Sequence, residues 1–103
     1  MVQRDYILRL IEQFVAMVAR IVGLSREGNV EAARRELEEA YVALGVPRSM
    51  VANLDSASIK LLVGEEKARA LAVLFSAEAE LARAEGREKE AAAWRARAAG
   101  LGL

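Results

Sequence analysis

The chain has 103 residues, no cysteine, no histidine, and fifteen basic against fifteen acidic side chains, which gives a net charge of zero. A chain of this length builds one modest core, so we expect a single helical domain over residues 1–103. The missing residue types exclude the usual zinc sites, disulfides, and catalysis by cysteine or histidine. The zero charge offers no electrostatic footprint for nucleic acid or an anionic membrane, so we expect neither as a partner.

The composition favours helices, because Ala (21), Leu (13), Glu (13) and Arg (12) together make up more than half of the chain. Charged residues interrupt the apolar stretch Met1 to Gly23, which therefore predicts neither a targeting segment nor a membrane span and favours a cytoplasmic protein. We expect an all-α fold of two antiparallel helical hairpins joined by a linker of short helices.

Turn residues divide the chain into its elements. They place hairpin 1 at about 3–45, the linker at 46–64 and hairpin 2 at about 65–100. The predicted helices cover 3–24, 30–44, 57–63, 65–85 and 87–99, with a further turn at 48–53.

The first helix carries more apolar surface than one neighbour needs, since its large apolar side chains span an arc of roughly 200°. We therefore expect it to be either the central helix of its own domain or half of a subunit interface. Near its start, Asp5 and Tyr6 could form a polar latch to another helix or subunit. The interaction residues of this hypothesis are Asp5, Tyr6, Leu10, Phe14, Met17, Ile21 and Trp94.

The second helix is amphipathic, with Asn29 as its expected N-cap and Gly45 closing its C-terminus. Its expected buried stripe is Val30, Ala33, Leu37, Ala40, Tyr41 and Leu44. In the linker, Asp55 or Ser56 can cap a short helix that we expect to fold over the open end of the first hairpin.

The last two helices are rich in alanine and poor in bulky side chains, so we expect this half to depend on docking against the first helix. Trp94 is the one large aromatic side chain of the last helix. Its ring would fill the space that the neighbouring alanines leave, so we interpret it as a core or dimer anchor rather than a ligand platform.

No residue pattern in the sequence predicts catalysis. The serines stand in no nucleophile motif. Glu78 with Glu85, and Asp5 with Glu12, lie seven residues apart on a helix face, but a di-metal site in a bundle normally adds histidine. We interpret these carboxylates as solvated surface acids, and expect no metal, no cofactor and no enzyme activity.

Two resemblances follow from short motifs. Gly28 and Gly86 each precede an alanine by five residues and a second alanine by twelve, which resembles the turn and second helix of a tetratricopeptide repeat. The two glycines lie 58 residues apart, however, against the 34-residue period of that repeat. A bundle with repeat-like hairpins therefore remains the favoured packing.

The opening residues Asp5, Tyr6 and Ile7 resemble the start of an uncharacterised family of small bacterial helical proteins that begin with a DYI-type motif. That resemblance implies a compact helical protein and no particular activity.

These observations favour a non-enzymatic helical interaction or scaffold module that forms a homodimer, or binds another protein, through its first helix. The alternative is a tetratricopeptide-like domain that holds a peptide or small ligand in a groove between the hairpins, beside Arg9, Gln13 and Arg20.

Overall fold

Residues 2–102 fold into helices without any strand, which confirms the all-α prediction. In this computed structural model the backbone is described for residues 2–102, and side chains are described for residue 6 and residues 8–102. The helices are α1 (Val2–Arg26), α2 (Val30–Leu44), α3 (Arg48–Val51), α4 (Ser56–Val63), α5 (Glu65–Ala84) and α6 (Glu88–Gly100).

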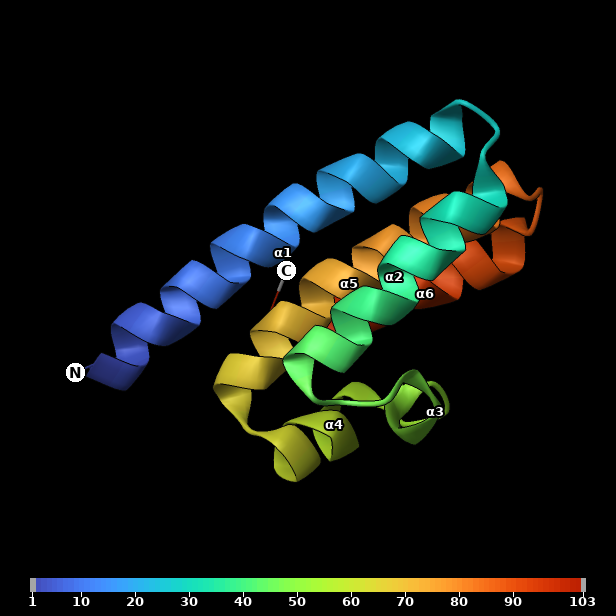
Figure 1. Cartoon of the computed structure of the whole chain (residues 1–103). Helices are drawn as coiled ribbons and strands as arrows, with labels where there is room; N and C mark the ends of the chain where they lie inside the picture. Colours follow the sequence, from blue (N-terminus) through green and yellow to red (C-terminus); the bar gives the residue numbers. More distant parts are fainter. Residues whose placement is uncertain (1, 103) are drawn as a thin grey trace.

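The long helices form two antiparallel hairpins, α1 with α2 and α5 with α6, as the sequence predicts. The hairpins lie side by side with α1 and α5 running in the same direction, while the short helices α3 and α4 gather at one end (Figure 1). The predicted helix boundaries agree with these elements to within two residues.

The central helix is α5, which packs against α1, α2, α4 and α6. Twelve of its twenty residues are buried, and six of those are alanines. Small side chains let several helices approach one axis closely, so alanine at these positions favours burial on many sides. The expectation that α1 could be the central helix is therefore wrong, because α5 holds that place.

Among the side chains of α1 that the structure describes, the buried ones form one stripe of Phe14, Ile21 and Ser25. At about 1.5 Å per residue, its 25 residues extend about 37 Å, whereas the 15 residues of α2 extend only about 22 Å. The N-terminal part of α1 therefore runs beyond the end of α2 (Figure 1).

The second helix follows its prediction closely, with Ala33, Leu37, Ala40, Tyr41 and Leu44 all buried. It ends at Gly45, whose φ of 78° is left-handed and whose N–H donates to the carbonyls of Tyr41 and Val42. Asn29 precedes the helix, but its side chain makes no capping hydrogen bond, contrary to expectation. Val30 is half-buried at the edge of the stripe.

The linker packs on the opposite hairpin from the one expected. Asp55 caps α4 by accepting a 2.9 Å hydrogen bond from the N–H of Ser58, as predicted. Helix α4 lies mainly against α5 and α6, with Ile59 fully buried, rather than over the end of the first hairpin. Close contact between α4 and α6 explains the difference. The hydroxyl of Ser56 donates to the carbonyl of Arg97, and Gly100 leaves room beside Ser56.

We predict that Gly100→Ala destabilises the protein by about 1–3 kcal/mol, because its new methyl group would lie 2.8 Å from the Cβ of Ser56. Thermal and urea unfolding measure the effect. The matched control is Gly23→Ala in α1, where a Cβ meets nothing within 4 Å and the loss of a helical glycine should stabilise by roughly 0.5–1 kcal/mol. Equal effects of the two substitutions would contradict the close approach of α4 and α6.

Candidate functional site

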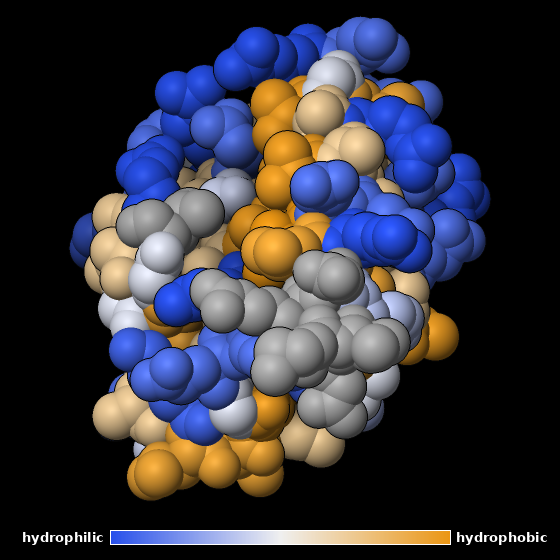
Figure 2. Space-filling model, turned by 90° about the vertical axis from the view of Figure 1, so that its left-hand side faces the viewer, coloured by the Kyte–Doolittle hydropathy of each residue, from blue (hydrophilic) through white to orange (hydrophobic). Residues whose placement is uncertain are grey.

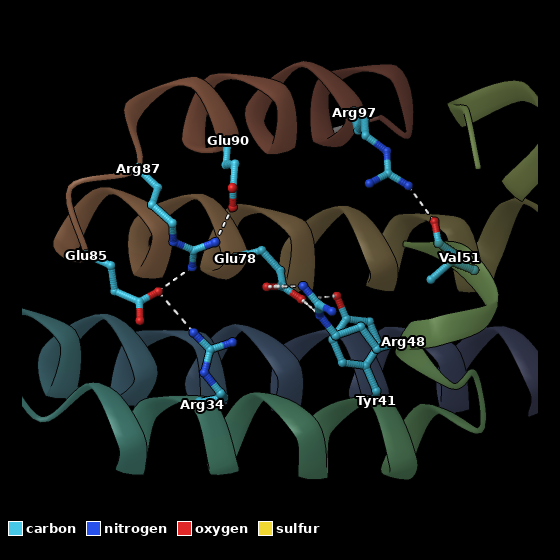
Figure 3. Close-up of polar contacts among 9 residues, drawn as sticks. All are labelled: Arg34, Tyr41, Arg48, Val51, Glu78, Glu85, Arg87, Glu90 and Arg97. Atoms are coloured by element: carbon cyan, nitrogen blue, oxygen red, sulfur yellow. Dashed lines mark hydrogen bonds and ion pairs between the residues drawn. The ribbon is translucent and has the colours of Figure 1, made fainter. Parts of the chain in front are cut away.

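The most deeply buried charged side chain is that of Glu78 in α5, which is only 3% exposed. Its carboxylate accepts a 2.9 Å hydrogen bond from the hydroxyl of Tyr41 in α2. It also accepts two from the guanidinium of Arg48 at the start of α3, at 2.5 Å from Nε and 3.3 Å from Nη2 (Figure 3). This cluster joins three helices around one carboxylate and compensates its burial.

The interpretation of Glu78 as a solvated surface acid is therefore wrong. The residue lies on the apolar stripe of α5 with Leu71, Phe75 and Ala82, at helical spacings of four, three and four. This helical spacing indicates that Glu78 is buried, and Tyr41 on the buried stripe of α2 supplies its polar partner. Glu85 behaves as predicted, at the exposed end of the hairpin, where Arg34 and Arg87 bind it.

Burial and charge shift the acidity of this cluster. Burial, followed by the negative charge of Glu78 and the hydrogen bond to it, raises the pKa of Tyr41 well above its ordinary range. The hydrogen bond to Glu78 likewise raises the pKa of Arg48. The Tyr41 hydroxyl therefore keeps its proton and serves as a hydrogen-bond donor rather than as a base.

A second cluster surrounds Arg97 in α6. Its guanidinium lies 4.7 Å from the ring centre of Phe75 and 4.8 Å from that of Trp94. It donates to the carbonyl of Leu54, at 3.1 Å from Nε, and to the carbonyl of Val51 (Figure 3). Burial lowers the pKa of Arg97. This side chain therefore ties the backbone that follows α3 to the second hairpin.

Trp94 is half-buried and packs within its own chain. Its ring meets that of Phe75 edge to face, at 4.8 Å between centres and an angle of 65°. The guanidinium of Arg48 lies 5.3 Å from the Trp94 ring centre and that of Arg97 lies 4.8 Å away. The Trp94 ring and these two guanidinium groups join α3 to α6.

The Glu78 and Arg97 clusters offer little space and few free polar groups for binding a ligand or a metal ion. Every fully buried polar side-chain atom in the described residues has a hydrogen-bond partner. The space among Arg34, Glu38, Arg48 and Glu78 amounts to about 40 Å³, close to the volume of a single water molecule. Among the described side chains, no group of three or more acidic residues is placed to hold a metal ion.

A partly exposed apolar strip runs along α1, and we call it the outer flank. It consists of residues spaced by three and four along the helix: Leu8, Ile11, Val15, Val18 and Val22. Leu8 and Val15 are each 52% exposed, and the other three are half-buried. Figure 2, seen from the N-terminal end of α1, shows apolar surface rising above the grey residues between polar borders.

The outer flank has the spacing of a coiled-coil seam, in which apolar residues alternate at three and four positions. This regular pattern was the signal available in the sequence. The interaction hypothesis instead selected residues near the centre of the apolar arc, which the chain uses for its own core.

The residues of that hypothesis fall into different environments. Phe14 and Ile21 are buried within the chain, and Leu10 and Met17 are half-buried against the same core. Tyr6 is 63% exposed on the part of α1 beyond α2. The side chain of Asp5 lies outside the described residues, so the latch is not described.

A groove of about 410 Å³ lies between the hairpins where α1 and α5 end. Its lining mixes charges of both signs and consists of Ser25, Arg26, Gly28, Glu80, Arg83 and Ala84. The residues expected to line such a groove lie elsewhere. Arg9, Gln13 and Arg20 are exposed, and Arg20 pairs with Glu36 of α2 at 3.5 Å.

A second exposed apolar patch covers the short helices, where Leu61 is 89% exposed, Leu62 54% and Met50 46%. Figure 2 shows apolar surface at the bottom of the molecule, the end at which α4 lies in Figure 1. Met50 and Leu62 border a groove of about 220 Å³ that Lys67 also lines.

No known protein family, no curated protein and no solved structure matches this chain. None of the helices in the described part of the chain is long and apolar enough to cross a membrane.

We predict that the stability of the protein decreases above about pH 10. The folded state keeps the Tyr41 proton there, because the pKa of Tyr41 is raised, whereas an unfolded tyrosine loses its proton near pH 10. The folded state then binds more protons than the unfolded state. The free energy of unfolding should decrease by up to about 1.4 kcal/mol per pH unit, and should not change through Tyr41 below that range.

Urea unfolding between pH 8 and pH 11 measures this slope. Tyr41→Phe should remove it, whereas Tyr6→Phe, at a position 63% exposed, should retain it. An unchanged slope in Tyr41→Phe would show that Tyr41 is not the buried titrating group.

Proposed function

We propose that this protein is a helical protein–protein interaction module that self-associates through the outer flank of α1. The observation that carries the proposal is the row of aliphatic side chains from Leu8 to Val22, in which Leu8 and Val15 are exposed and the other three are only partly covered by the chain's own core. Full burial of an aliphatic side chain of this size is worth about 1.5–3 kcal/mol. A row of five half-covered ones is therefore a substantial reserve of unburied apolar surface.

The position of the outer flank also suits a partner. It runs along one side of a single straight helix, so another helix can cover it along its whole length. It faces away from α2, because Arg20, on the opposite side of α1, pairs with Glu36. A second chain can therefore reach it without displacing either hairpin.

An enzymatic role has less support. The buried carboxylate of Glu78 is held by both Tyr41 and Arg48, and the sequence offers no cysteine or histidine as nucleophile or base. The ligand-groove alternative keeps one supporting observation, the 410 Å³ groove between the hairpins. Ligand sites are usually apolar with a few polar groups, whereas this groove is lined by charged residues of both signs.

We predict that the protein sediments as a dimer at tens of micromolar and that Val15→Glu converts it to a monomer. A charge at position 15 would be buried without a partner in the dimer but solvated in the monomer, because Val15 is 52% exposed there. Analytical ultracentrifugation measures the oligomeric state, and thermal unfolding confirms that the fold is kept.

The matched control is Val42→Glu on α2, at a position 80% exposed and away from the outer flank, which should remain dimeric. A monomeric wild-type protein at these concentrations, or an undiminished dimer of Val15→Glu, would contradict the proposal.

A further inference from the structure

The outer flank adjoins a polar stripe on α5. The side of α5 that faces away from the core carries the exposed Arg69 and Arg83 and the half-buried Ser76 and Glu80, with the buried Val73 on the same stripe. Arg26, which continues the outer flank by one turn beyond Val22, shares the 410 Å³ groove with Glu80 and Arg83. The apolar stripe of α1 and the polar stripe of α5 therefore belong to one face of the molecule.

The two stripes can be placed in register, because α1 and α5 run parallel and Ser25 lines the same groove as Ala84. Counting ten residues back from each puts Val15, the middle of the outer flank, level with Leu74 in α5. Arg69 then lies five residues before this level and Glu80 six residues after it. At about 1.5 Å per residue, these two charges lie about 8 and 9 Å on either side of the middle.

A second copy can cover this face in two symmetric ways, since homodimers most often have two-fold symmetry. If the two-fold axis runs along the helices, the outer flank of α1 lies against the partner's α5. Arg69, Glu80 and Arg83 would then lose their water beneath aliphatic side chains. An axis across the helices, near Val15, places α1 against α1 and α5 against α5, each pair antiparallel. Only the second arrangement joins apolar surface to apolar surface.

The two-fold axis that runs across the helices also places opposite charges of the two α5 helices next to each other. Because Arg69 and Glu80 lie at nearly equal distances on opposite sides of the middle, the rotation brings Arg69 of one protomer opposite the partner's Glu80, twice in the dimer. Val73 and Ser76 lie between them, and because Val73 is buried and Ser76 half-buried, neither projects far between the two α5 helices. Glu80 is available for such a pair, since its contact with Arg83 within the chain is long, at 3.6 Å.

We infer that the partner of the outer flank is a second copy of this chain in an antiparallel two-fold dimer, in which Arg69 of each protomer pairs with the partner's Glu80. This inference rests on the proposed self-association and adds its geometry. The apolar row drives association, and the two charge pairs select the orientation.

Charge reversal tests the pairing. Arg69→Glu and Glu80→Arg should each weaken the dimer by about tenfold or more, because each creates two like-charge contacts across the axis. The double variant Arg69→Glu with Glu80→Arg restores opposite charges and should recover most of the wild-type dissociation constant. Sedimentation at low salt measures all four proteins, and thermal unfolding of each variant controls for the fold.

The possible outcomes distinguish the proposed charge pairing from the proposed self-association. Recovery in the double variant supports the antiparallel pairing. If the two single effects add in the double variant, or if neither reversal changes the dissociation constant, the pairing is overturned while the dimer stands. A wild-type monomer contradicts the proposed function itself. The control Arg35→Glu changes an exposed charge on α2 beside Val42, away from the proposed interface, and should leave the dimer unaffected.

Discussion

The fold depends on the burial of α5 on nearly all sides. Four of the other helices pack against it, and its six buried alanines let them approach one axis closely. Bulky side chains are confined to a few of its positions, where Leu71, Leu74 and Phe75 are fully buried. A helix rich in small residues can therefore be the centre of this protein, because its alanines admit the neighbouring helices while its few large side chains fill part of the core.

Because α5 is the central helix, only part of the apolar surface of α1 is buried in the core. The helix contributes Phe14 and Ile21 to the core, while its outer flank faces away from α2 and is only partly covered. The polar clusters hold the rest in place. Glu78 joins α2, α3 and α5, while Arg97 fixes the linker backbone to α6. Polar clusters thus join the helices on the side of α2, α3 and α6, whereas the outer flank of α1 presents partly exposed apolar side chains.

Much of this could be predicted from the sequence. Turn glycines and apolar periodicity predicted the two hairpins, and the buried stripe of α2 was assigned correctly except for the half-buried Val30. The predictions failed where the answer depended on which helix lies in the middle. The wide apolar arc of α1 suggested either a central helix or half of a subunit interface. The first alternative is wrong, because burial is decided by how closely neighbours can approach, which favoured the alanines of α5.

The burial of the charged residue Glu78 also depends on the assembled fold, which the sequence alone does not show. Glu78 occupies a core position in the helical repeat, but its burial depends on Tyr41 and Arg48, which are 37 and 30 residues away in the sequence. Helical spacing alone could place Glu78 on the buried side. Only the assembled fold shows the partners that compensate its charge.

We propose the outer flank of α1 as the surface through which this protein binds a second copy. Because the chain has no cysteine, Val15→Cys and Val42→Cys each introduce a single exposed thiol that a short thiol-specific cross-linker can report. We expect rapid cross-linking of the Val15→Cys protein into a covalent dimer, and slow cross-linking of Val42→Cys at the same concentration. Equal rates for the two proteins would contradict it.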